Sequence, residues 1–217
     1  MVWGIANVDY KFNAHWSASI DNQFRYEYTD GDIFMWLVRP SVSYKFKSGL
    51  ALTLGSAYFS LYTNPNGKVP RPELRPWQEI GWKFESPTKT HTLYPRLRFE
   101  ERVIREYAGE VLAEDFTLNC VRVRARIDYT YKFHADQPIG LLLFAGNETF
   151  FLRKPDGYTA YDQNRAWVGV GYRFSKQFTV QASYLNWYQQ RTSSVFDQLH
   201  VMRLALQFQL EKKPKTT

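Results

Sequence analysis

The stretch VRVRARIDYTYKF, residues 121–133, decides the fold of this chain. Its odd positions are apolar or aromatic, whereas the even positions between them are arginine, aspartate, threonine and lysine. Successive side chains of a β-strand point to opposite faces of the sheet, so the stretch predicts a strand with one apolar and one charged face. A helical repeat would mix the two sets on every face.

The same alternation of period two continues from one end of the chain to the other. It predicts a single all-β unit over residues 1–210, an antiparallel up-and-down barrel of 10–12 strands. Eleven strands are legible, but we favour twelve, because both ends of a single-chain bacterial barrel normally lie in the periplasm and require an even number. The expected strands are residues 2–12, 16–28, 33–46, 50–62, 75–85, 92–104, 121–133, 139–152, 163–174, 178–190 and 199–210.

A short repeat, aromatic then cationic then aromatic, marks one end of the expected hairpins. Each copy is followed by a brief polar connection, whereas the connections at the other ends are mostly longer, as at 63–74, 105–115, 153–162 and 191–198. Short periplasmic turns and long outer loops are typical of outer-membrane barrels, and aromatic rings are favoured at the membrane-water interface. The repeat predicts an aromatic girdle of Tyr10, Phe12, Tyr44, Phe46, Trp82, Phe84, Tyr131, Phe133, Tyr172 and Phe174. The opposite rim has its own outward-phase aromatics, which are Phe24, Tyr26, Tyr28, Phe34, Trp36, Tyr58, Tyr62, Tyr184 and Tyr188.

Composition agrees with a barrel that crosses a membrane. Aromatic residues make up 18% of the chain, and no apolar stretch is long enough for a transmembrane helix. A soluble barrel or sandwich would also alternate, with the apolar set as its core, but it rarely needs aromatic triplets along one rim. We therefore expect location in the outer membrane of a Gram-negative bacterium, with a signal peptide removed from the chain and residues 211–217 as a basic tail that is native or appended.

Arginine dominates the phase expected to face the lumen. The expected basic cluster is Arg96, Arg98, Arg102, Arg122, Arg124, Arg126 and Arg165, and its expected acidic partners are Glu79, Glu100 and Asp128. Two interpretations remain open. The arginines and carboxylates form a network that fills and rigidifies a narrow lumen, or they line a porin-like, anion-preferring channel or solute-binding pore. Nucleic acid is not expected as a partner, because these arginines line an enclosed surface.

Evidence for catalysis is thin in this sequence. Only His200 lies near the expected outer rim, with Ser193, Ser194 and Asp197 in the preceding loop, so a lipid- or peptide-modifying site there is a minor alternative. Glu100 and Glu101 are adjacent in a strand and face opposite sides. Cys120 is the single cysteine and lacks neighbours at metal-ligand spacing. We expect no catalytic residues, no metal and no cofactor.

The chain resembles an uncharacterised family of outer-membrane barrels that is common in Bacteroidetes and is defined as a domain of unknown function. The resemblance spans nearly the whole chain and rests on Trp3 before Tyr10-Lys11-Phe12, on residues 75–78 and 98–102, on 162–165 leading into 168–172, and on 200–204. The tail after residue 210 departs from barrels of this sort, which usually end at an aromatic residue. The family implies fold and location, and no activity.

The predicted function is that of a structural or partner component of the outer membrane. Its expected partners are the lipid bilayer with lipopolysaccharide, other outer-membrane or periplasmic proteins, and small anions held by the arginines.

Overall fold

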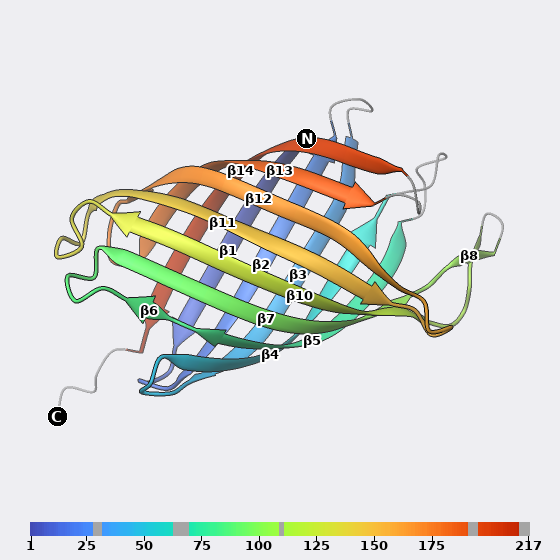
Figure 1. Cartoon of the computed structure of the whole chain (residues 1–217), viewed down its shortest axis with the longest axis horizontal. Coiled ribbons are helices and arrows are strands. Elements are labelled where there is room, and N and C mark those ends of the chain that lie inside the picture. The colour runs from blue at the N-terminus through green and yellow to red at the C-terminus, as the bar shows by residue number, and fades with distance from the viewer. Residues whose placement is uncertain (28–31, 63–69, 109–110, 191–194, 213–217) are drawn as a thin grey trace.

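The computed structural model describes residues 1–27, 32–62, 70–108, 111–190 and 195–212, and in this part the chain forms a closed β-barrel (Figure 1). Fourteen strands are present among these residues, eleven of them long. The long strands are β1 (Val2–Lys11), β2 (Trp16–Glu27), β3 (Asp32–Lys45), β4 (Leu50–Leu61), β5 (Arg71–Trp82), β7 (His91–Ile104), β10 (Thr117–Lys132), β11 (Gly140–Arg153), β12 (Thr159–Arg173), β13 (Phe178–Gln190) and β14 (Phe196–Glu211). The short ones are β6 (Phe84–Glu85), β8 (Tyr107–Ala108) and β9 (Val111–Leu112).

Each long strand pairs antiparallel with the next one along the chain, and β7 pairs with β10 across the small β8–β9 hairpin. The barrel closes where β1 meets β14, and this pair is parallel, from Val2 beside Met202 to Lys11 beside Glu211. Eleven strands therefore form the wall in the described residues.

The expectation of twelve wall strands is not met. The twelfth strand of the sheet, β6, is two residues long and pairs only with β7. An even number of wall strands is required only where the first and last strands pair antiparallel. Here β1 and β14 pair parallel, so an odd number of strands closes the barrel.

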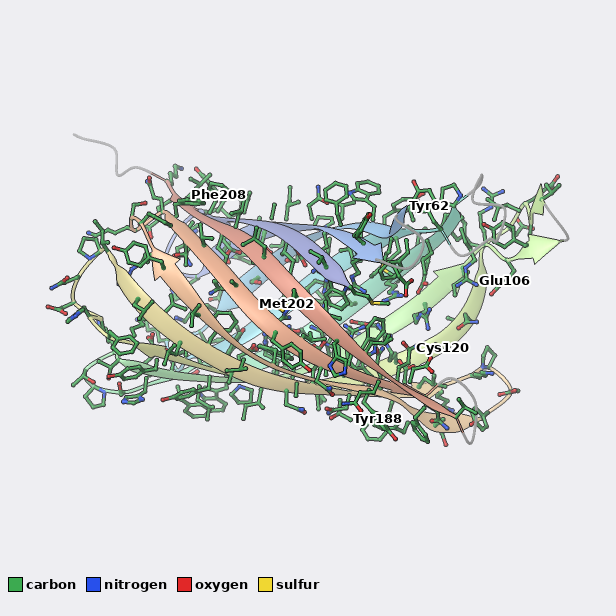
Figure 2. All side chains as sticks on the ribbon, turned by 90° about the horizontal axis from the view of Figure 1, so that it is seen from above. Tyr62, Glu106, Cys120, Tyr188, Met202 and Phe208 are labelled. Carbon is green, nitrogen blue, oxygen red and sulfur yellow. The ribbon has the colours of Figure 1, made fainter. Side chains whose placement is uncertain are left out.

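The faces of the wall are the reverse of those of a soluble protein. Large apolar side chains stand exposed on the outside, for example Leu54 (66%), Val168 (60%) and Met202 (55%). Charged side chains are buried inside, whereas in soluble proteins they are almost never fully buried. A soluble barrel would have the apolar set as its core, which this structure does not. The side chains standing outside the wall are visible along its whole length in Figure 2.

The described residues contain no helix that is long and apolar enough to span a bilayer.

Two apolar clusters also lie inside the barrel, which simple alternation did not predict. One contains Trp3, Trp167, Leu185, Trp187 and Val201. The other contains Met35, Leu37, Ala57, Phe59 and Leu61, so β3 and β4 are apolar on both faces near their long-loop ends. The lumen is therefore packed with aromatic and aliphatic groups as well as charges.

Candidate functional site

The arginine-rich lumen is built by neighbouring strands whose inward phases face each other. The register sets Arg122 beside Glu100, Arg124 beside Arg98 and Arg126 beside Arg96 across the β7–β10 pair. Alternation brings every second residue of each strand to the lumen. The structure places the whole expected basic cluster and its three expected acidic partners on this inner face, and Arg98, Glu100, Arg122 and Arg124 are buried.

The three expected carboxylates each hold more than one arginine. Oε2 of Glu100 lies 3.0 Å from Nε of Arg122, and Oε1 lies 3.7 Å from both Arg98 and Arg124. Glu79 Oε2 accepts a hydrogen bond of 2.8 Å from Nε of Arg98 and lies 2.7 Å from its Nη2, while Glu79 Oε1 lies 3.6 Å from Arg96. Shared carboxylates of this kind allow arginines of like charge to pack closely.

Asp128 is the third of these carboxylates. It accepts two hydrogen bonds of 2.8 Å from Arg126, which is a bidentate pair, and it also contacts Arg96. Bidentate pairing fixes the guanidinium in geometry as well as in charge.

Three further carboxylates, Glu73, Glu148 and Asp162, make ion pairs with arginines of the expected cluster and were not predicted as its partners. Glu73 is fully buried and binds Arg102 through two hydrogen bonds of 2.6 and 3.0 Å, and it also contacts Arg75. This residue was missed because it falls in a segment that was expected to be a loop, residues 63–74, whereas β5 already begins at Arg71.

Glu148 and Asp162 are the other two. Glu148 lies 3.1 Å from Arg124 and 3.3 Å from Arg165, and its inward phase on β11 was visible in the sequence. Asp162 lies 3.2 Å from Arg122. A β-bulge in the β11–β12 pair turns Asp162 inward together with its neighbour Gln163, and alternation alone would place the two on opposite faces.

Aromatic rings support the guanidinium groups. Arg98 lies 3.7 Å over the Trp77 ring, Arg75 lies 3.7 Å over Phe59, and Arg25 lies 3.9 Å over Trp3. A desolvated cation over an aromatic face gains about 2 kcal/mol. These inward rings were not predicted, because aromatic residues were assigned to the outer face.

The lumen contains two cavities. The turn-side cavity, of about 550 Å³, faces the short connections, and the loop-side cavity, of about 230 Å³, faces the long ones. Four side chains line both cavities, and they form the layer between them: Arg39, Trp77, Arg98 and Arg124. Each arginine of the layer makes an ion pair, Arg39 with Asp21, Arg98 with Glu79 and Arg124 with Glu148.

The residues of the expected aromatic girdle lie at the short-turn ends of their strands. Within each of the five triplets the two rings contact each other, with centroids between 4.8 Å in Tyr172–Phe174 and 5.7 Å in Trp82–Phe84. At the other rim Phe24, Tyr62, Tyr184 and Tyr188 are exposed, while Tyr28 lies outside the described residues.

The residues considered for catalysis do not come together in the described part of the chain. His200 is exposed on β14, where its Nδ1 lies 2.5 Å from the Tyr184 hydroxyl, and Asp197 is three residues away in the opposite phase. Ser193 and Ser194 lie outside the described residues. Glu100 is buried whereas Glu101 is exposed on the outer side. Cys120 is buried, and the described residues hold no group of three or more side chains that could bind a metal.

The fold and the site together define a closed β-barrel with an apolar exterior and an ionic interior. The chain belongs to the family described as "Protein of unknown function (DUF2490)", which it matches over residues 1–199. No curated protein shows significant sequence similarity to it. Among solved structures, the beta domain of the Bordetella autotransporter Brka is similar, with 13% identity and a TM-score of 0.49 over 89% of this chain and 82% of that one.

Proposed function

We propose that the protein is an outer-membrane barrel of a Gram-negative bacterium, with its short turns in the periplasm and its long connections outside. The exposed apolar wall supports this location, because such a surface is stable in lipid and prone to association in water. The aromatic residues at the two rims support the orientation of the wall across a bilayer. The bilayer and its lipopolysaccharide are then its first partners.

Within that membrane, the proposed role is that of a structural or partner component whose lumen is closed. The observation that carries this proposal is the layer of Arg39, Trp77, Arg98 and Arg124, which lies between the two cavities. Its arginines are held by four carboxylates, Asp21, Glu79, Glu100 and Glu148. A barrel of eleven strands has limited interior space, and these side chains fill its middle. Other outer-membrane or periplasmic proteins are the partners that such a closed barrel would hold.

An anion-preferring channel is the alternative, and the charge of the lumen favours it. Twelve arginines and six carboxylates line the two cavities in the described residues, and two more buried carboxylates, Glu73 and Glu148, contact them. A positive wall of low dielectric concentrates anions. If the central layer opens, the same charges would select for anions.

Single-channel recording in planar bilayers distinguishes a closed barrel from an anion channel. The wild-type barrel is expected to be silent, and the triple variant R98S/E100S/R124S is expected to give discrete current steps. Each charged residue that loses a partner in this variant keeps another one: Glu79 keeps Arg96, Arg122 keeps Asp162, and Glu148 keeps Arg165. Anion-selective current through the wild type would favour the channel, and a silent triple variant would show that Arg98 and Arg124 are not the seal.

The partner role is tested by extraction from native membranes in mild detergent. The barrel is expected to migrate as a complex larger than the single chain, and affinity capture would then identify what it holds. Migration as a single chain under conditions that preserve other outer-membrane complexes would contradict the partner role.

A further inference from the structure

The loop-side cavity has more hydrogen-bond donors than the protein can satisfy. Nine arginines line it in the described residues, against two carboxylates, Glu100 and Asp162. Counting every carboxylate that makes an ion pair with one of these nine, including those shared with other arginines, gives seven. A surplus of positive charge remains at this end of the lumen.

Arg25 is the clearest case. Its side chain is buried, and within the described residues it has no carboxylate at ion-pair distance. Among the described residues its side chain donates one hydrogen bond, from Nη2 to the neutral Gln23 oxygen at 3.2 Å. Its Nε has no hydrogen-bond partner there, and Trp3 covers one face of the guanidinium. Removing a guanidinium from water without a counter-charge is costly, so an anion is the missing partner that its environment favours.

Other buried donors around the same cavity are also unpartnered. They include Nη1 of Arg98, Nε of Arg165 and the indole nitrogens of Trp77 and Trp187, and all four residues line the cavity. Gln163 Oε1 is the one unpartnered acceptor among the described residues lining it. Spare donors from several strands with little spare acceptor capacity define a site for a ligand that accepts hydrogen bonds.

One wall of the cavity is apolar rather than charged. Met35, Ala57, Phe59 and Leu61, from β3 and β4, line it, and Arg75 of the neighbouring strand β5 lies over one face of Phe59. An inorganic anion would leave this wall against water, whereas an organic anion would cover it. The volume of about 230 Å³ is below the usual range for drug-sized ligands, so the ligand is small.

From these observations we infer that the loop-side cavity binds a small organic carboxylate, with the carboxylate among Arg25, Arg98 and Arg165 and a compact apolar or aromatic body against Met35 and Leu61. The site is independent of the proposed partner role. It is a binding site on the loop side of the central layer and does not require solute to pass through the barrel.

The experiment uses the full chain refolded in detergent micelles, with benzoate as the probe and calorimetry as the measurement. Benzamide is the neutral isostere, and inorganic phosphate is the anion without an apolar body. Wild type is expected to bind benzoate, with weaker binding of phosphate and benzamide. Equal binding of benzamide, tighter binding of phosphate, or no binding of benzoate would overturn the inference.

Two arginine variants locate the site. R25Q is expected to weaken benzoate binding about tenfold, the value of one charge-assisted hydrogen bond. Arg25 has no carboxylate partner among the described residues, so its replacement leaves no unpaired acid. R203Q is the matched control, because Arg203 also bonds a neutral group, Ser183, and stacks over a tryptophan, but lines the turn-side cavity. R203Q is expected to bind benzoate like wild type. An equal loss of benzoate affinity in both variants, with the β-sheet circular dichroism retained, would contradict the assignment of the site to the loop-side cavity.

Discussion

At the scale of single residues, glycines make room for the inward tryptophans. Gly55 lies beside Trp77 and Gly146 beside Trp167 in the register, and each indole ring lies over its glycine. A side chain at Gly146 would meet that ring and would also lie 2.7 Å from the backbone oxygen of Ile127. The backbone oxygen cannot move aside as a flexible side chain can, so the position requires a glycine.

We expect G146A to destabilise the barrel by about 1–3 kcal/mol, the usual cost of overpacking. The matched control is G4A, because a Cβ at Gly4 meets nothing within 4 Å. Urea unfolding of both variants in lipid vesicles measures the difference. If G146A unfolds at the wild-type urea concentration, the indole does not pack over the glycine as described.

Glu73 makes a second residue-scale prediction. It is fully buried and holds Arg75 and Arg102, so E73Q leaves two partly buried guanidinium groups without their carboxylate. Breaking a fully buried pair costs about 3–5 kcal/mol, so we expect E73Q to destabilise the barrel by about 3 kcal/mol. E101Q, at an exposed position on the outer side of β7, is expected to be neutral or slightly stabilising in the same urea measurement. A neutral E73Q would show that the network does not stabilise the fold.

At the scale of elements, alternation was enough to predict eleven strands, and their positions follow the expectation closely. The errors lie at the long-loop ends, where β5, β10 and β12 each begin four residues before the expected start. There the sequence no longer alternates cleanly: Pro72 lies within β5, and Asn119 and Asp162 lie at bulges. Strand ends that depend on partners and bulges cannot be read from a period of two. The missed Glu73 and Asp162 follow directly from this.

The closure of the barrel could not be predicted from local sequence, because nothing in β1 or β14 alone specifies a parallel neighbour. It follows from the number of strands that the whole wall contains. The site was predicted only in part, because it too depends on more than local sequence. Strand phase identifies which arginines face inward, but the register between strands decides which carboxylate each arginine contacts.

Disulfide crosslinking tests the parallel pair in a C120A background. Val8 and Phe208 are register partners and both face outward, so V8C/F208C is expected to crosslink on mild oxidation. V8C/L204C is the control, because four residues along a strand span about 13 Å, beyond the reach of a disulfide. Gel migration reports the link. Equal crosslinking of both pairs would show that the seam has no fixed register.

At the scale of the whole molecule, the apolar exterior and the ionic interior both fit a barrel wall that is surrounded by lipid. The outer wall is stable only where water is absent, and the inner network is stable only where carboxylates offset the arginines. Together they allow the chain to bury a cluster of paired arginines and carboxylates while exposing many large apolar side chains on its outer wall. The two rims then differ in chemistry, because aromatic triplets occupy the short-turn end while the surplus arginines lie toward the long connections.

This difference predicts which end faces the cell exterior. Asp156 is exposed between β11 and β12 at the long-connection end, and Lys176 is exposed between β12 and β13 at the short-turn end. With the buried Cys120 replaced by alanine, a membrane-impermeant maleimide added to intact cells is expected to label D156C and not K176C. Lysis should expose both. Labelling of K176C and not D156C would show the opposite orientation of the barrel in its membrane. Recovery of both variants in the soluble fraction would contradict a membrane location. Labelling of D156C alone would place the surplus arginines and their cavity on the outer side, where a small carboxylate could reach them without crossing the central layer.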